Sequence, residues 1–261
     1  MKNTEEKYLQ HKQEIVVAVG DTDFNGNVKP SAIMGYCQDI ANEHAGMLGF
    51  GYTDLLAKNL SWAMIRMSFK ILKSPKIGEA LIIKTFPEKS NTLDVNRGYY
   101  IYNTDGETVI SASSKWCVLD VNTHKVNRLA PVLQKYDESN FIPHQPFDDA
   151  NPKIQALSDS DLEIVNTFTV QVTDLDQNFH MNNARYGDII LNACGVEALK
   201  ENSISRIDLN FISQLFIGDR YEVYKAQKDN ITFIEARKVS SDTAVFRACV
   251  EWQVIFPHIG T

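Results

Sequence analysis

The feature that most constrains the fold of this chain is an internal repeat. The segment Asp174-Leu-Asp-Gln-Asn-Phe-His180 has an earlier counterpart, Asp21-Thr-Asp-Phe-Asn-Gly-Asn27, which shares three of its four polar positions but lacks the histidine. Apolar residues at helical spacing follow both segments, as expected for an amphipathic helix with one buried face. These residues are Ile33, Tyr36, Cys37, Ile40 and Ala41 after the first segment and Tyr186, Ile189, Ile190, Ala193 and Cys194 after the second.

The similarity between the two halves continues beyond these helices. Residues 68–79 parallel residues 208–219, and both stretches end in an Ile-Gly pair and an acidic residue. The spacing between matched positions changes only in small steps along the chain, which indicates a duplication rather than chance. With 261 residues, the chain is long enough for two domains. The last matched residues are Ile110, Ala112, Trp116 and Val118 in the first half and Phe246, Ala248, Trp252 and Val254 in the second.

Each half is predicted to contain one helix and several long strands. A long antiparallel sheet around one central helix, occurring twice, describes an α+β protein with two tandem hotdog domains. We expect the N-terminal hotdog domain over residues 1–130, a linker rich in Pro, Asp, Asn and Ser over 131–160, and the C-terminal hotdog domain over 161–261. In the first half we predict strands near 14–19, 62–71, 80–86, 93–102 and 108–121 and a helix over 30–47. In the second half we predict strands near 163–173, 204–212, 221–227, 231–238 and 244–256 and a helix over 183–199.

The composition excludes several classes of protein. Hydrophobic residues make up 44% and charged residues 23%, as in ordinary globular domains, and no apolar run is long enough to span a membrane. A formal net charge of −7 argues against nucleic acid as a partner. The N-terminus lacks the apolar stretch of a secretory signal, so we expect a cytoplasmic protein. The four isolated cysteines, Cys37, Cys117, Cys194 and Cys249, are expected to be reduced core residues.

The polar loop of the second half is the candidate for chemistry. In an extended loop, Asp176, Asn178 and His180 would point to one side and present a carboxylate, an amide and an imidazole. The loop leads into a helix, whose free N–H groups could stabilise an oxyanion. The competing interpretation is that these residues only cap the helix, as Asp and Asn often do. Because a cap would not need a histidine in one half only, we favour the chemical interpretation.

A metal or cofactor is not expected. Residues 21–26 match the opening of an EF-hand calcium loop, but Ala32 occupies the twelfth position, where a glutamate is required. The second copy has Phe179 at the glycine position and Arg185 at the twelfth. The sequence contains no nucleophile elbow, phosphate-binding loop, dinucleotide fingerprint or zinc-ligand spacing. On the strand near 62–71, Trp62, Met64 and Met67 could line a tunnel for an acyl chain, although such a run more often belongs to the core.

The second loop resembles the signature Asp-Leu-Asp-x-Asn-x-His-x-Asn-Asn-x-x-Tyr of the plant and bacterial acyl-acyl-carrier-protein thioesterases, which it matches over residues 174–186. The first half has a Gly-Asp-x-Asp motif over 20–23 that also resembles a motif of this family. The resemblance implies a tandem hotdog enzyme that hydrolyses fatty acyl thioesters on acyl carrier protein and so terminates fatty acid synthesis. It implies that the first half shapes the acyl tunnel and that the second half carries catalysis.

The resemblance also assigns residues. The catalytic Asp, Asn and His of the family fall on Asp176, Asn178 and His180, and a further family glutamate on the strand after the helix aligns with Gln214. Glutamine can position water or a carbonyl group but cannot act as a base. The cysteine that follows this glutamate in plant members is Leu215 here, which argues against a cysteine nucleophile. Our mechanistic hypothesis is that Asp176 and His180 activate water while Asn178 and a helix N-terminal amide hold the carbonyl group.

Three other interpretations remain at this point. The carrier could be coenzyme A instead of acyl carrier protein. The chain could be a hotdog hydratase or dehydratase, since these enzymes also combine an acidic residue with a histidine on a related scaffold. It could also be a non-catalytic acyl-thioester binder, which Gln214 in place of the glutamate would explain. A homodimer is also left open.

Overall fold

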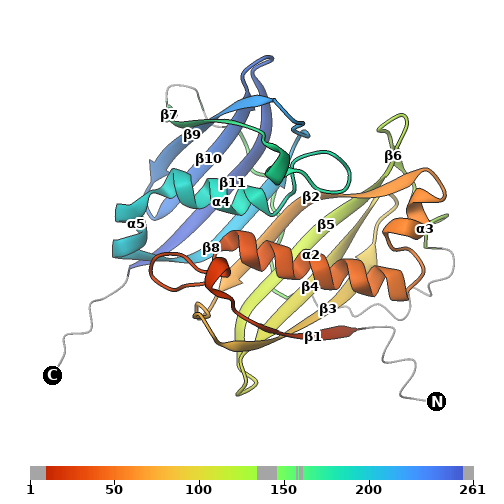
Figure 1. Cartoon of the computed structure of the whole chain (residues 1–261), viewed down its shortest axis with the longest axis horizontal. Coiled ribbons are helices and arrows are strands. Elements are labelled where there is room, and N and C mark those ends of the chain that lie inside the picture. Colours follow the sequence, from red (N-terminus) through yellow and green to blue (C-terminus); the bar gives the residue numbers. More distant parts are fainter. Residues whose placement is uncertain (1–9, 134–145, 157, 159–160, 255–261) are drawn as a thin grey trace. The chain divides into compact units, whose positions relative to one another are not determined.

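A computed structural model describes residues 10–133, 146–156, 158 and 161–254 of the chain (Figure 1). Contacts divide the chain into two compact units. The first comprises residues 1–28 and 32–152, and the second comprises residues 29–31 and 153–261. No helix within the described ranges is long and apolar enough to cross a membrane. Part of the segment expected as a linker, residues 134–145, 157 and 159–160, lies outside the described residues, as do the last two residues of the strand expected over 244–256.

The first unit is an antiparallel sheet with one long helix. The strand order is β1-β3-β4-β5-β2, with the short β6 beside β5. The long helix α2 (Pro30–Met47) lies across this sheet, and a short helix, α3 (Tyr52–Leu56), follows it. The strands are β1 (His11–Val16), β2 (Leu60–Ile71), β3 (Ala80–Ser90), β4 (Asp94–Tyr102), β5 (Thr108–Asp120) and β6 (Val126–Asn127).

Helix α2 has the bounds predicted from its apolar spacing. Pro30 is its first residue, where the missing proline N–H would have no partner within the helix. Ile33, Cys37 and Ile40 are at most 1% exposed, because they lie on the face that covers the sheet. Each fully buried apolar side chain of this size contributes about 1.5–3 kcal/mol. The helix therefore holds the first unit together through the stripe seen in the sequence.

The second unit repeats this architecture. Its antiparallel sheet has the order β7-β9-β10-β11-β8, so each strand occupies the position of its counterpart in the first unit. Tyr186 of the helix α4 packs edge-on against Phe211 and Phe246 of this sheet, at ring centroid distances of 5.5 and 4.8 Å. The elements are β7 (Glu163–Thr169), α4 (Arg185–Cys194), α5 (Val196–Glu201), β8 (Asn202–Phe211), β9 (Arg220–Lys228), β10 (Ile231–Lys238) and β11 (Thr243–Val254). Two hotdog units of α+β class are thus present, as predicted.

The prediction of one helix over 183–199 was wrong in one respect, because this segment forms two helices. Gly195 separates α4 from α5 with φ +82° and ψ 164°, a backbone conformation that is essentially restricted to glycine. The N–H of Gly195 still donates to Leu191, which completes the last turn of α4. The chain then changes direction, and Leu199 of α5 remains buried.

Candidate active site

The second polar loop is a tight turn and not the extended segment that we predicted. Leu175 and Met181 form an antiparallel bridge, and between them the Asp176 N–H donates to the His180 carbonyl oxygen at 3.0 Å. The Phe179 N–H donates back to the Asp176 carbonyl oxygen, also at 3.0 Å. Asp176 and His180 are therefore close because they lie opposite each other at the base of a hairpin. The alternation of side chains along an extended strand is not what brings them together.

The side chains of Asp176 and His180 form a pair. The His180 Nδ1 lies 3.4 Å from the Asp176 Oδ2 and 3.4 Å from the carbonyl oxygen of Met181. Because both neighbours of Nδ1 are acceptors, the tautomer with the proton on Nδ1 is favoured, and Nε2 is then free to accept a proton. The two side chains are 20% and 15% exposed, so water and a substrate can reach them. The other carboxylate oxygen of Asp176 accepts the Asn178 N–H at 2.8 Å, which holds the carboxylate in place.

The two amide side chains assigned to the site are available for a ligand. Asn178 and Gln214 are both partly exposed, and neither side chain has a hydrogen-bond partner within the part of the chain that the structure describes. Gln214 lies past the end of β8 and not on the strand where its family counterpart was expected. It directly precedes Leu215, whose carbonyl oxygen accepts the Met181 N–H at 2.8 Å. The main chain thus brings Gln214 to the same loop as His180.

The first loop is built with the same hydrogen bonds. The Asp23 N–H donates to the Asn27 carbonyl oxygen at 2.8 Å, and the Gly26 N–H donates to that of Asp23 at 3.0 Å. The Asp23 carboxylate accepts the Asn25 N–H at 2.8 Å, as Asp176 accepts that of Asn178. The loops differ at the last polar position, where the Lys76 ammonium donates to the Asn27 side chain at 2.5 Å. The matched residue in the second half is Phe216, which forms an antiparallel bridge with His180.

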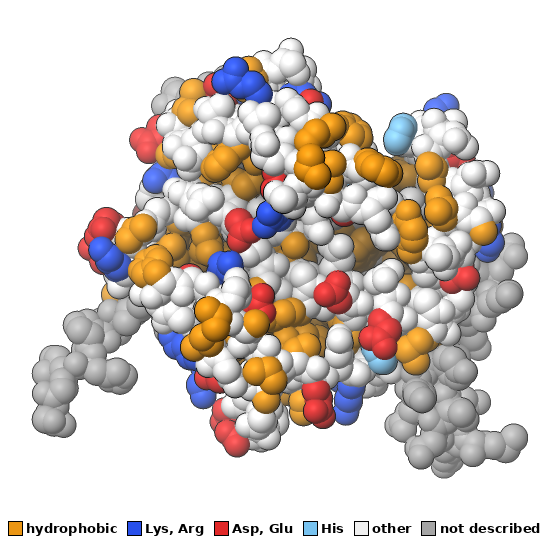
Figure 2. Space-filling model, in the orientation of Figure 1, with side chains coloured by type: hydrophobic (Ala, Val, Ile, Leu, Met, Phe, Trp, Pro, Cys, Tyr) orange, Lys and Arg blue, Asp and Glu red, His pale blue; other side chains and the backbone are white. Residues whose placement is uncertain are grey.

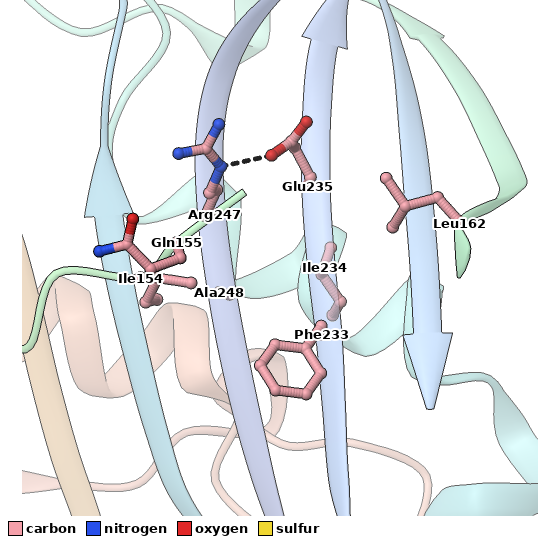
Figure 3. Close-up of a pocket in the computed structure, with 8 residues that line it drawn as sticks. All are labelled: Ile154, Gln155, Leu162, Phe233, Ile234, Glu235, Arg247 and Ala248. Atoms are coloured by element: carbon pink, nitrogen blue, oxygen red, sulfur yellow. Dashed lines mark hydrogen bonds and ion pairs between the residues drawn. The ribbon is translucent and has the colours of Figure 1, made fainter. Parts of the chain in front are cut away.

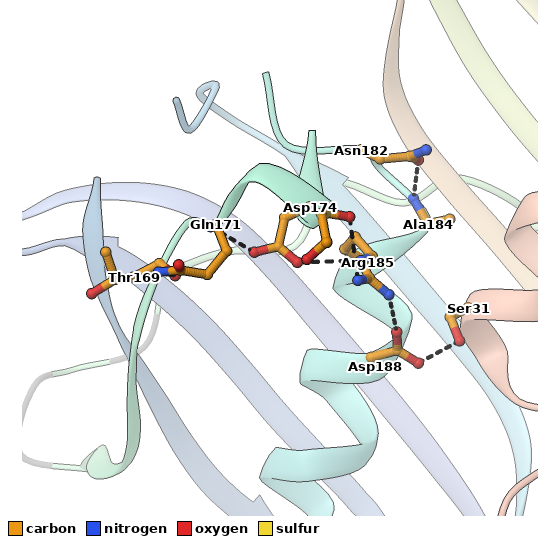
Figure 4. Close-up of polar contacts among 9 residues, drawn as sticks. Ser31, Thr169, Gln171, Asp174, Asn182, Ala184, Arg185 and Asp188 are labelled. Atoms are coloured by element: carbon orange, nitrogen blue, oxygen red, sulfur yellow. Dashed lines mark hydrogen bonds and ion pairs between the residues drawn. The ribbon is translucent and has the colours of Figure 1, made fainter. Parts of the chain in front are cut away.

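A network of charges joins the second loop to α4 (Figure 4). One carboxylate oxygen of Asp174 accepts the Gln171 N–H at 2.8 Å, and the other lies 3.3 Å from the Arg185 guanidinium. Arg185 also pairs with Asp188 one turn along the helix, at 3.4 Å. In the first unit, Tyr36 donates to the matched Asp21 at 2.6 Å. The first Asp of each motif thus has a structural role, which its position at the strand–helix junction predicts.

The start of α4 does not offer the free amides that we predicted for an oxyanion. The Ala184 N–H donates to the side chain of Asn182 at 2.9 Å. The N–H groups of Arg185 and Tyr186 donate to the carbonyl oxygens of Asn182 and Asn183 at 3.0 and 3.2 Å. These local bonds satisfy the donors that a helix N-terminus usually leaves open. A carbonyl group at this site would therefore have to bind other donors, such as the Asn178 amide.

The cysteines are free thiols and are poor nucleophiles. Cys37, Cys117 and Cys194 are buried as predicted, whereas Cys249 is partly exposed. Burial raises the pKa of Cys194 to about 12. The pKa of Cys249 is also raised to about 12, mainly by burial. Because the thiolate is the reactive form, both thiols are unreactive at neutral pH.

The residues that could line an acyl tunnel lie in or against the core of the first unit. Met64 and Met67 are 6% and 1% exposed. Trp62 packs against a cluster that includes Ala45, Phe50 and Val118, and its indole N–H donates to the Phe50 carbonyl oxygen at 2.9 Å. These contacts support the interpretation as core.

A pocket in the second unit lies apart from the polar loop (Figure 3). It is shallow and open to solvent, and its charged residues are Glu235 of β10 and Arg247 of β11, which form an ion pair. Arg247 alternates with Phe246, which contacts α4, so the charged pair lies on the opposite face of the sheet. Asp176, Asn178, His180 and Gln214 are not among the residues that line it.

Comparisons with known proteins agree with the two-unit organisation. Residues 8–136 match the model of the acyl-ACP thioesterase N-terminal domain, and residues 157–254 match that of the acyl-ACP thioesterase C-terminal domain. An acyl-[acyl-carrier-protein] hydrolase of Cuphea viscosissima is 26% identical over 188 residues, which are 69% of this chain and 46% of the relative. An oleoyl-acyl carrier protein thioesterase of Arabidopsis thaliana is 24% identical over 217 residues, 78% of this chain and 60% of the relative. The chain thus spans about half the length of the curated relatives it matches.

Two solved structures have the same fold. An acyl-ACP thioesterase from Bacteroides thetaiotaomicron superposes with a TM-score of 0.85 at 24% identity and covers 95% of this chain and 99% of that protein. A 12:0-ACP thioesterase from Umbellularia californica also gives 0.85, at 18% identity, with coverage of 94% and 98%. At these identities the superpositions establish the fold of the chain.

Proposed function

The chain belongs to the acyl-ACP thioesterase family, and we propose that it hydrolyses fatty acyl thioesters carried on acyl carrier protein. The observation that carries the proposal is the Asp176–His180 pair, held by a hairpin at the surface of the second unit. Its counterpart in the first unit keeps the hairpin but has Asn27 in place of the histidine. Curated relatives of the chain are named as thioesterases of acyl carrier protein, which supports this substrate.

In the proposed mechanism, His180 acts as a general base. Its Nε2 takes a proton from a water molecule whose oxygen attacks the thioester carbonyl carbon, while Asp176 stabilises the imidazolium that forms. The Asn178 amide donates a hydrogen bond to the carbonyl oxygen as it becomes negative. The carbon–sulfur bond then breaks, and the departing thiolate takes the proton from His180. Water and thioester thus give a free fatty acid and the carrier thiol, without a covalent enzyme intermediate.

Gln214 has a supporting role in this proposal. Its amide has no partner within the described residues and could orient the attacking water, although it cannot remove a proton. We assign catalysis to the second domain, over residues 161–261, and the binding of the acyl chain to the first, over residues 1–130. Three expectations from the sequence stay predictions. They are the linker over residues 131–160, the cytoplasmic location and the possible homodimer.

The experiment is to incubate the pure protein with acyl carrier protein loaded with fatty acyl chains of different lengths and to measure free fatty acid. We expect release with at least one chain length. The same assay on Gln214→Glu tests the supporting role, because a carboxylate that can accept a proton should change the rate. Addition of water to an enoyl thioester without hydrolysis would instead identify a hydratase. Tight binding without any turnover would identify a non-catalytic binder, and both results would refute the proposal.

A further inference from the structure

Phe179, between Asn178 and His180, has a backbone conformation that does not suit its side chain. Its φ is +61°, in the left-handed region that bulky residues rarely adopt. The other non-glycine residues with positive φ in the described ranges are all Asn, Asp or His, which tolerate this region better. The six are Asn59, His124, Asp149, Asn151, Asp229 and Asp242. Phe179 is therefore the one large apolar residue among them.

The turn itself does not require phenylalanine. The matched residue in the first loop is Gly26, with φ +71°. The Gly26 and Phe179 N–H groups both donate at 3.0 Å to the carbonyl oxygen of the aspartate three residues earlier. Glycine adopts this conformation without strain. The second loop thus contains a side chain that disfavours the backbone conformation of its own residue. Strain of this kind clusters at active sites and ligand-binding positions.

Packing within the chain does not compensate for this strain. The Phe179 side chain is 78% exposed, more than any other exposed large apolar residue of the described chain. The antiparallel bridge between His180 and Phe216 brings Phe216 and its neighbour Ile217 next to this loop, and Phe216 and Ile217 are 44% and 54% exposed. We call these three exposed apolar residues of the two bridged segments, Phe179, Phe216 and Ile217, the apolar rim of the second loop. Apolar side chains are visible at the surface over this loop (Figure 2).

The position of the rim indicates which part of a substrate would cover it. A thioester that reacts at His180 has its acyl chain on one side of the sulfur and its carrier on the other. An acyl chain is entirely apolar and needs an enclosed site away from water. The open rim suits a group that is partly apolar and partly polar. The pantetheine arm, with methyl and methylene groups between its amides, has this character.

We propose that Phe179 is a substrate-binding residue whose ring packs against the pantetheine arm that presents the thioester to His180. This inference rests on the proposed function. It explains why an exposed phenylalanine occupies a position that glycine fills in the first loop. The contact is made with the carrier side of the substrate, so it contributes to binding and leaves the chemical step unchanged.

The variant Phe179→Gly tests the contact, because it removes the ring and also relieves the backbone. We expect KM for the acyl-carrier substrate to rise about tenfold, with kcat within about twofold of wild type and with thermal stability unchanged or higher. Phe179→Tyr keeps an aromatic ring and should keep the wild-type KM. The matched control is Phe24→Gly, which removes the exposed phenylalanine of the first loop and should leave KM unchanged.

A second substrate shows whether the arm is the partner. With an acyl thioester of N-acetylcysteamine, which lacks most of the arm, kcat/KM of Phe179→Gly should equal that of wild type. An equal loss with both substrates would overturn the inference, as would an unchanged KM for the acyl-carrier substrate. If the wild-type protein releases no fatty acid from any thioester, the proposed function itself has failed, which is a different result.

Discussion

At the scale of single residues, two substitutions at matched positions distinguish the loops. His180 replaces Asn27, and Phe216 replaces Lys76, whose ammonium binds the Asn27 side chain. An ammonium beside His180 would disfavour the imidazolium that the proposed mechanism forms. Phe216 removes this charge, so the imidazole can pair with Asp176. The two changes are consistent with one another and point to chemistry in the second loop.

The sequence pattern selects the candidate residues of the site, but it does not show their geometry. The spacing of Asp176, Asn178 and His180 made this loop the candidate, and the single histidine favoured the second half. The hairpin that brings Asp176 and His180 together depends on hydrogen bonds between main-chain atoms, which the side-chain pattern does not show. The strain at Phe179 has one sequence signal, which is phenylalanine at the position of Gly26.

Glu88 of β3 gives a prediction about pH. Its side chain is 4% exposed, and neither carboxyl oxygen has a hydrogen-bond partner within the described part of the chain. Burial raises the pKa of Glu88 from 4.5 to about 7. Asn96, Lys115 and Ser113 oppose this rise, although no contact to the carboxyl group has the geometry of a hydrogen bond. The folded protein therefore keeps a proton that the unfolded chain loses above about pH 4.5.

The free energy of unfolding should consequently fall between about pH 4.5 and pH 7, by about 3 kcal/mol from this group. Glu88→Gln removes the titration and keeps the size of the side chain, so the variant should gain stability relative to wild type as the pH rises. Urea denaturation at pH 5 and pH 8 measures this gain. Glu14→Gln, at an exposed position on β1, controls for the loss of a negative charge. If the free energies of unfolding of Glu88→Gln and wild type differed by the same amount at both pH values, this account would be contradicted.

At the scale of elements, the periodic patterns predicted the helices and strands well. Helix α2 and strand β10 have the predicted bounds. In α2 the buried residues keep the helical spacing from Ile33 to Ala45. The break between α4 and α5 was missed because the apolar spacing continues on both sides of Gly195. Its conformation of φ +82° and ψ 164° depends on where α5 packs, which local sequence does not determine.

Gly195 also gives a prediction at this scale. Gly195→Ala should lower the free energy of unfolding by about 1–3 kcal/mol, because the required backbone conformation is open almost only to glycine. Gly35→Ala is the matched control, since Gly35 lies inside α2 with space for a methyl group, and alanine there should raise stability by about 0.5–1 kcal/mol. Denaturation with urea measures both. If Gly195→Ala were as stable as wild type, the break in the helix would not depend on glycine.

At the scale of the whole molecule, the duplication explains the organisation of the chain. Both units have the same strand order and the same loop at the junction before the main helix. The repeat in the sequence predicted the two units and the hotdog architecture, since matched residues occupy matched strands. The division of function between the units that we propose rests on the asymmetry between the two loops. One loop has a histidine beside a carboxylate, and the other has an asparagine held by a lysine.

The most direct test of this account replaces His180 with the residue of the other loop. His180→Asn should lower kcat for the release of fatty acid from acyl carrier protein by about 10²–10⁴-fold, because it removes the proposed general base. Asn27→Ala, the matched change in the first loop, should leave kcat within about twofold of wild type. Circular dichroism of both variants checks whether they are folded. Wild-type turnover by His180→Asn, or an equal loss in Asn27→Ala, would contradict the assignment of catalysis to the second loop.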